Sequence, residues 1–154
     1  MDDYSYMGLA LEEAERAAAL GETPVGAVLV WEGAVVAKAH NRRELDKIAT
    51  AHAELLAIEA ACKTLGGWRL HKGALYVTLE PCPMCAGAII NARIRRLVFA
   101  APDRKAGCCG SMTNLFALPF NHRPEVVGGV REAESAELLT RFFQELRQRR
   151  KDTE

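Results

Sequence analysis

A short pattern of metal-binding residues constrains this chain more than any other feature. His52 stands two residues before Glu54, and Cys82 and Cys85 follow further along the chain, within the sequence PCPMC at 81–85. Imidazole and thiolate groups are ligands that zinc prefers, and a catalytic zinc site uses three protein ligands and keeps its fourth position open. Because the pattern supplies three such ligands and one further carboxylate, it predicts one catalytic zinc ion per chain, bound by His52, Cys82 and Cys85.

The two cysteines are predicted to lie at the start of a helix. Residues 75–79 are rich in β-branched and aromatic side chains, which is typical of a buried strand, and Pro81 ends that strand. In the helix that follows, side chains three residues apart share one face, so Cys82 and Cys85 can reach the same metal ion. The positive end of the helix also favours the thiolate form that a zinc ligand must have.

His52 is predicted to lie in the first turn of a second helix. Thr50 is a residue type that caps helix N-termini, and apolar residues at helical spacing follow as far as residue 66. Side chains two residues apart point in different directions, so His52 can bind the metal while Glu54 faces the water and the substrate. Glu80, at the end of the preceding strand, is expected to orient the metal-binding loop and to take no part in the chemistry.

The composition indicates one domain spanning residues 1–154. The chain is 49% hydrophobic and 26% charged, which is enough apolar content to bury a core. Its formal net charge is zero, which argues against a non-specific polyanion binder and requires any contact with nucleic acid to be local. The apolar run 25–31 is too short to span a membrane and the N-terminus lacks a signal-peptide pattern, so we expect a cytoplasmic protein with no membrane partner.

Strands and helices alternate along the chain, which predicts an α/β sandwich with a central mixed sheet. A hairpin near the N-terminus should give antiparallel pairing, and the strand–helix–strand unit from 75 to 100 should be parallel. The expected helices cover 9–20, 51–66, 82–91 and 133–150, and the expected strands cover 25–30, 34–39, 75–79, 96–100 and 125–130, with a short segment at 115–118.

The other three cysteines are expected to have structural roles. Cys62 falls on the apolar stretch of the second predicted helix and is interpreted as a small core residue. Cys108 and Cys109 are adjacent, and they could serve as extra metal ligands, as a redox pair or as small loop residues. The last interpretation is favoured, because adjacent cysteines form strained disulfides and a reducing compartment disfavours disulfides.

The metal-binding pattern and its surroundings resemble a known group of enzymes. The order H-x-E followed by P-C-x-x-C is the signature of the zinc-dependent nucleobase deaminases. The segments 24–28, 50–54 and 78–88 are similar to those of the cytidine and deoxycytidylate deaminase superfamily, and within it the chain most resembles the bacterial tRNA-specific adenosine deaminases. The likeness covers nearly the whole chain and continues at 41–42, 93–94, 98–100, 107–111, 121–123 and 142–143.

The resemblance implies a fold, a reaction and an assembly. The implied fold is a three-layer α/β/α sandwich around a central mixed five-stranded sheet. The implied activity is the zinc-dependent, hydrolytic deamination of adenosine to inosine at the wobble position of a tRNA anticodon loop, carried out by a homodimer. Glu54 would be the catalytic general base and acid. The Asn41 side chain and the Ala53 backbone would hold the base, although a turn after the hairpin also explains Asn41.

Further contacts with RNA are expected outside the base-binding residues. Phe142 and Phe143 cannot both face one way, so one is predicted in the core and the other is predicted to stack on a base. His122 suits a loop-stabilising role equally well, and a solvated helix surface also explains the basic final helix. The candidates for RNA contact are Asp103, Lys105, His122, Arg123, Phe142, Phe143 and Arg147.

Two alternative functions are open from the sequence. An enzyme with the same zinc chemistry on a free base or nucleotide, such as guanine or cytosine, would need neither a basic final helix nor an aromatic platform. A non-catalytic, zinc-stabilised RNA-binding module would have no use for Glu54 beside the metal.

Overall fold

A mixed sheet of five strands, in the order β2-β1-β3-β4-β5, forms the centre of the molecule. The computed structural model describes residues 1–153. β1 pairs antiparallel with β2 and with β3, whereas β3, β4 and β5 run parallel to one another, which confirms the predicted mixed sheet. The strands are β1 (Gly26–Trp31), β2 (Ala34–His40), β3 (Gly73–Leu79), β4 (Arg96–Ala101) and β5 (Glu125–Val127).

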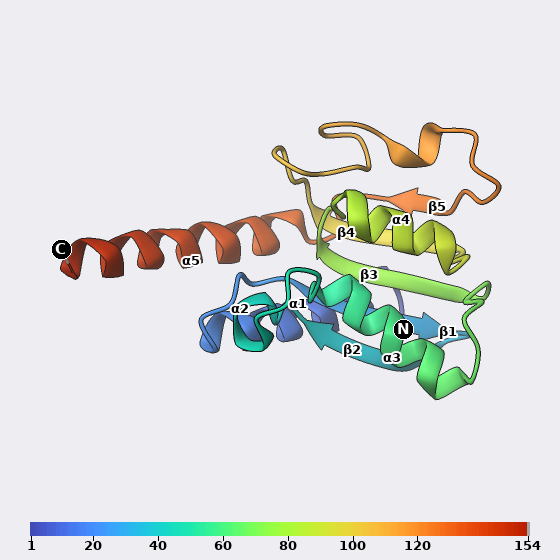
Figure 1. Cartoon of the computed structure of the whole chain (residues 1–154), viewed down its shortest axis with the longest axis horizontal. Helices are drawn as coiled ribbons and strands as arrows, with labels where there is room; N and C mark the ends of the chain where they lie inside the picture. The colour runs from blue at the N-terminus through green and yellow to red at the C-terminus, as the bar shows by residue number, and fades with distance from the viewer. Residues whose placement is uncertain (154) are drawn as a thin grey trace.

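Helices cover both faces of this sheet, so the molecule has the three layers that were expected (Figure 1). One face carries α3 and α4, and the other carries α1 and the start of α5. Among residues 1–153, no helix is both long enough and apolar enough to cross a membrane. The helices are α1 (Asp3–Ala19), α2 (Arg43–Asp46), α3 (Ala53–Leu65), α4 (Pro83–Asn91) and α5 (Glu132–Asp152), with a 3-10 turn η1 (Leu115–Ala117).

The central strands divide their side chains between the two faces because successive residues of a strand point in opposite directions. On β3, Leu75 and Val77 belong to the hydrophobic cluster beneath α3 and α4. Ala74 and Tyr76 belong to the cluster beneath α1. β3 is thus buried on both faces, which explains why its sequence is a continuous apolar run.

Helix α1 begins at Asp3, six residues before the predicted start at residue 9. The side chain of Asp2 caps it by accepting a hydrogen bond from the Ser5 backbone N–H at 2.9 Å. Tyr6 and Met7 then lie buried against the sheet. The prediction was wrong because these two residues precede the alanine-rich repeat on which it was based.

Helix α2 was not predicted, and a residue distant in the sequence explains its position. Glu22 is fully buried, and its carboxylate accepts hydrogen bonds from the backbone N–H groups of Glu44 and Leu45. These bonds satisfy donors at the start of a helix too short to be stable alone. Glu22 and α2 together position the segment that precedes α3.

The C-terminal part of the chain differs from the prediction in two ways. β5 ends at Val127 instead of residue 130, because the glycine that follows packs its backbone against the ring of Phe99 and leaves no space for a side chain. Helix α5 extends far beyond the sheet, with the C-terminus at its free end (Figure 1). The prediction of one core phenylalanine on α5 was wrong: Phe142 is half-buried and Phe143 is exposed, and their rings contact edge to face at 5.4 Å.

Candidate metal centre and active site

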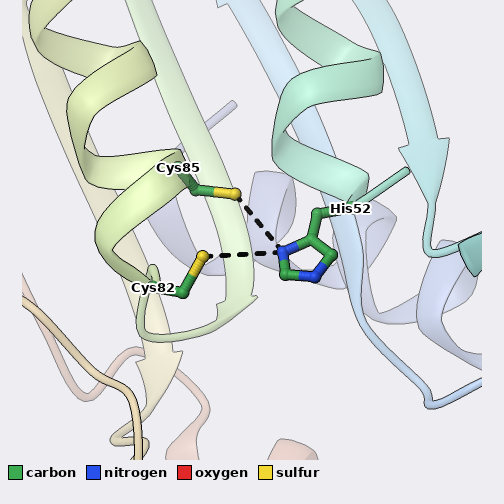
Figure 2. Close-up of side chains that lie close together, drawn as sticks. All are labelled: His52, Cys82 and Cys85. Carbon is green, nitrogen blue, oxygen red and sulfur yellow. Dashed lines mark hydrogen bonds between the residues drawn. The ribbon is translucent and has the colours of Figure 1, made fainter. Parts of the chain in front are cut away.

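Three potential metal ligands converge where α3 and α4 begin side by side (Figure 2). His52 Nδ1 lies 3.6 Å from Cys82 Sγ and 3.5 Å from Cys85 Sγ. One ligand atom from each of the three residues lies within 4.8 Å of the others. The structure therefore brings the three predicted ligands together at one point, although helix α3 and strand β3 lie between His52 and Cys82 in the sequence.

The local backbone explains how this convergence arises. His52 and Cys82 both occupy the N-cap position, immediately before α3 and α4 respectively, and Cys85 lies in the first turn of α4. The predicted cap Thr50 is wrong: it lies two residues earlier and is exposed. Because both helices begin at the cluster, their positive ends point toward it and favour negatively charged groups there.

The hydrogen bonds inside the cluster create a thiolate. Cys82 accepts a hydrogen bond from the Cys85 thiol and another from the His52 ring, and these bonds lower the pKa of Cys82 to about 4 in spite of its partial burial. The pKa of His52 is raised, chiefly by the same bond to Cys82. Cys82 is therefore ionised at neutral pH, which is the form that binds a metal ion.

Glu54 lies beside this cluster in the first turn of α3 and is not one of its three ligands. Its side chain is only 4% exposed. Burial raises the pKa of Glu54, because a low-dielectric environment disfavours the charged carboxylate. A carboxyl group with a raised pKa holds a proton more readily than an ordinary carboxyl group, which suits a general base and acid.

A cavity of about 300 Å³ opens next to the cluster. Its volume is at the lower end of the range for small-molecule sites, so it suits one base and not a duplex. Residues from four regions line it: the segment between α1 and α2 with the start of α2, the start of α3, the end of β3 with the start of α4, and the loop after β4. The lining residues include Thr23, Val25, Asn41, Arg43, Glu44, His52, Ala53, Glu54, Leu79, Glu80, Cys82, Asp103 and Ala106.

The two predicted base-binding residues both line this cavity. Asn41 is 9% exposed; its Nδ2 donates to the Thr23 carbonyl at 3.3 Å, and its Oδ1 accepts from the Arg43 N–H at 3.1 Å. These bonds are those of a residue that stabilises a turn, and they fix the orientation of the Asn41 amide. The amide still has one N–H donor and one acceptor lone pair of its oxygen free for another partner. Ala53 is the first residue of α3, where the backbone N–H has no partner within the helix.

Glu80 lines the cavity and binds the loop after β4. Its carboxylate is 3% exposed and accepts hydrogen bonds from the backbone N–H groups of Asp103, Cys109 and Ser111 and from the Ser111 hydroxyl. Burial alone would raise the pKa of Glu80, but these bonds outweigh it and lower the pKa. A side chain at Gly107 would collide with this carboxylate, so the loop 103–111 closes tightly around it. The prediction that Glu80 orients the metal-binding loop was wrong, because its carboxylate binds the loop 103–111 that follows β4.

The remaining cysteines lie outside the metal-binding cluster found among residues 1–153. Cys108 is 2% exposed and packs in the hydrophobic cluster beneath α3 and α4. Cys109 and Cys62 are half-buried at its border. All three are free thiols, in agreement with the preferred structural interpretation.

The candidate RNA contacts fall into three separate places. Asp103 lines the cavity, and Lys105 is exposed on the same loop. Phe142, Phe143 and Arg147 lie along α5. His122 and Arg123 line a different hollow, at the opposite end of the sheet from the metal cluster.

Comparison with known proteins connects this geometry to a family. The profile of the MafB19-like deaminases matches residues 1–147. The tRNA-specific adenosine deaminase of Bacillus subtilis (strain 168) is 52% identical over 150 residues, which are 97% of this chain and 93% of that protein. This chain belongs to the tRNA-specific adenosine deaminases. Another member of the tRNA-specific adenosine deaminases, from Agrobacterium fabrum, is 51% identical over 92% of this chain and 94% of its own length.

Solved structures also show the family's fold. A structure from work on A-to-I editing by tRNA:A34 deaminases at the wobble position is 49% identical and superposes with a TM-score of 0.85, covering 88% of this chain and 99% of that chain. A guanine deaminase from Nitrosomonas europaea has a TM-score of 0.80 at 26% identity, covering 90% and 83%. The fold therefore serves both a tRNA and a free base, and the higher identity places this chain with the tRNA-specific adenosine deaminases.

Proposed function

We propose that this chain is a zinc-dependent enzyme that converts adenosine to inosine at the wobble position of a tRNA anticodon loop. The observation that carries the proposal is the combination of three converging ligands with a buried carboxylate that is not a ligand, beside a cavity, in a member of this family. A structural metal site has four protein ligands and needs no such carboxylate. The combination therefore favours a catalytic site.

The donor set and its spacing fit one zinc ion per chain, held by His52, Cys82 and Cys85. Tetrahedral zinc with Zn–S of about 2.3 Å and Zn–N of about 2.0 Å places a nitrogen and a sulfur ligand about 3.5 Å apart. The two distances from His52 Nδ1 to the sulfur atoms are 3.6 and 3.5 Å. Zinc, when bound there, supplies a Lewis acid that activates water near neutral pH.

The residues of the chain would then carry the proton transfers. Glu54 accepts a proton from the attacking water, and the oxygen bonds to C6 of the adenine ring. Glu54 passes this first proton to the ring nitrogen N1. It then takes the second proton from the new hydroxyl on C6 and gives it to the amino group, so the C6–N bond breaks, ammonia leaves and C6 becomes a carbonyl. The product is a hypoxanthine base, so adenosine becomes inosine.

Binding of the base would depend on groups that line the cavity. The Asn41 amide and the Ala53 N–H offer a fixed donor and acceptor pattern to the edge of the base. An anticodon loop presents unpaired bases, so one of them can enter the cavity without melting of a duplex. Lys105 on the cavity loop and Arg147 on α5 are exposed and free to contact the RNA backbone.

We also propose a homodimer, the assembly that the resemblance noted from the sequence implies. Met112, Leu118 and Phe120 lie exposed in the segment before β5, and an apolar interface would bury them. Thiolate ligands and a tRNA substrate suit a reducing compartment, and we propose the cytoplasm. Light scattering of the purified protein would test the assembly.

Mass spectrometry of nucleosides tests the proposed activity. The zinc-loaded protein is incubated with total bacterial tRNA, the tRNA is digested, and inosine is measured, with free guanine and free cytosine as parallel substrates. We expect inosine to accumulate in tRNA and both free bases to remain nearly unchanged. Conversion of free guanine to xanthine with no gain of inosine would favour the guanine deaminase alternative, for which the Nitrosomonas europaea structure provides the fold.

A further inference from the structure

A second hollow, lined by four arginines and two histidines, lies at the end of the sheet opposite to the metal cluster. It measures about 510 Å³. Strands β3, β4 and β5 start at this end, on the right in Figure 1, whereas the metal ligands follow the other end of β3. The lining residues are Arg69, His71, Arg93, Arg95, His122 and Arg123.

The topology explains why these six residues meet. Each of them lies in a segment that immediately precedes one of three adjacent parallel strands, and the starts of parallel strands share one edge of a sheet. Three separate stretches of sequence thus bring basic residues to one place.

The length of β3 gives the distance between the hollow and the metal cluster. β3 has seven residues. At about 3.3 Å per residue, roughly 20 Å separate the hollow from the metal cluster.

The four arginines of the hollow make no ion pair in the described structure. Two ion pairs, Lys72 with Glu32 and Arg96 with Glu125, lie at the same end of the sheet, but among residues 1–153 no ion pair involves Arg69, Arg93, Arg95 or Arg123. Arg95 and Arg123 are exposed and make no side-chain hydrogen bond in the described structure. Grouped guanidinium groups without carboxylate partners repel one another, and a bound anion relieves that repulsion.

Two residues of the hollow also shape it. His122 Nε2 donates a hydrogen bond of 2.6 Å to the Ile94 carbonyl, because a carbonyl oxygen can only accept. Arg93 Nη1 donates to the Ile90 carbonyl at 2.7 Å, at the end of α4. The first bond joins the segments before β4 and β5, and the second ties the segment before β4 to α4, so the hollow is built into the fold and does not depend on flexible side chains alone.

An aromatic ring at the border of the hollow indicates the kind of anion. Trp68 is 56% exposed, and the guanidinium of Arg69 lies 5.0 Å from the centre of its ring. Guanidinium groups bind phosphate in a fork, and exposed aromatic rings stack on bases. A polynucleotide offers both phosphates and bases, whereas inorganic phosphate offers only the first.

We propose that this basic hollow binds backbone phosphates of the RNA substrate, as a second contact surface remote from the metal cluster. The proposal rests on the proposed function for the choice of RNA. A nucleic-acid duplex carries one charge per roughly 1.7 Å of its axis, and each base pair carries two charges, so one base pair spans roughly 3.4 Å. A separation of about 20 Å therefore corresponds to roughly six base pairs. A whole tRNA supplies that length beyond its anticodon loop.

The test compares RNA affinity at several salt concentrations. The double variant Arg95→Gln with Arg123→Gln removes two exposed charges of the hollow, and Lys38→Gln removes an exposed charge on β2, away from the hollow, as a control. We expect the first variant to bind labelled whole tRNA more weakly and to lower the salt slope of log Kd by about 2 relative to the control. Its zinc content and thermal melting should equal those of the wild type. A variant with lysine at both positions should restore the slope.

Several outcomes decide the proposal separately from the proposed function. An unchanged salt slope, or an equal drop in the control variant, would overturn it. Saturable binding of inorganic phosphate at micromolar concentration that the glutamine variant loses, with tRNA affinity unchanged, would assign the hollow to a free phosphate and also overturn it. If the wild type binds tRNA with the expected slopes but forms no inosine, the proposed function fails while the RNA-binding hollow stands.

Discussion

At the scale of single residues, two buried carboxylates near the metal cluster differ because their surroundings differ. Glu54 is buried beside the cluster, and burial raises its pKa. Glu80 is equally buried, but four hydrogen bonds from the loop 103–111 keep its pKa below the usual range. Different environments give one carboxyl group the properties of a proton carrier and the other those of a permanent anchor.

Replacing Glu54 by glutamine should separate metal binding from turnover. The amide has nearly the same shape but cannot accept a proton from water, so we expect Glu54→Gln to keep its zinc and its fold and to lose roughly 10²–10⁴-fold in kcat. Cys85→Ala should instead lose the metal itself, since Cys85 is one of only three ligands in the cluster. Metal analysis and inosine formation measure the two effects. Near-normal turnover by folded Glu54→Gln protein would refute the role of Glu54.

Replacing Glu80 by glutamine should destabilise the protein in a pH-dependent way. A folded-state pKa below the unfolded value means that the charged carboxylate stabilises the fold above pH of about 4.3 and that this stabilisation is lost as pH falls through the folded-state pKa. We expect Glu80→Gln to lower the free energy of unfolding by about 2 kcal/mol at pH 7, with the difference from the wild type shrinking below pH of about 4. Denaturant unfolding at several pH values measures this. The exposed Glu12→Gln serves as a control, and an equal loss at all pH values would contradict the assignment.

At the scale of elements, local pattern predicted most strands and helices and long-range contacts decided the rest. The bounds of β1 to β4 and α4 lie within two residues of the prediction, because their apolar periodicity is strong. The metal ligands were predictable for a similar reason, since their spacing along the chain is fixed by two helix starts. Helix α2 was not predictable, because Glu22 stabilises it from outside its own sequence. The basic hollow was equally hidden, since only the parallel pairing of β3, β4 and β5 unites its residues.

The projecting part of α5 is expected to contact RNA through its charges. Arg147 and Arg149 are exposed there and make no ion pair in the described structure. The double change Arg147→Ala with Arg149→Ala should weaken binding of an anticodon stem-loop and reduce the salt slope of log Kd by about 2, without loss of zinc. The uncharged, exposed Gln144→Ala is the matched control on the same helix. Fluorescence anisotropy at increasing salt measures the slope, and a slope equal to that of the control would show that α5 is only a solvated helix.

At the scale of the whole molecule, zero net charge conceals a separation of charge. The basic hollow lies at one end of the sheet, and the metal cluster and its cavity lie at the other. Helix α5 extends beyond the sheet (Figure 1). A protein without a global positive field gains RNA affinity only from such local clusters. This arrangement suits a structured RNA that presents one unpaired base to a small cavity and its backbone to surfaces further away.

The central claim is that the metal cluster and Glu54 hydrolyse an adenosine within RNA, and one measurement tests it most directly. The zinc-loaded protein is mixed in excess with an anticodon stem-loop containing a wobble adenosine, in water enriched in heavy oxygen, and the digested nucleosides are weighed by mass spectrometry. The account predicts inosine at that single position, carrying one heavy oxygen from the water, together with one released ammonia. Absence of inosine, or inosine without the heavy oxygen, would contradict it.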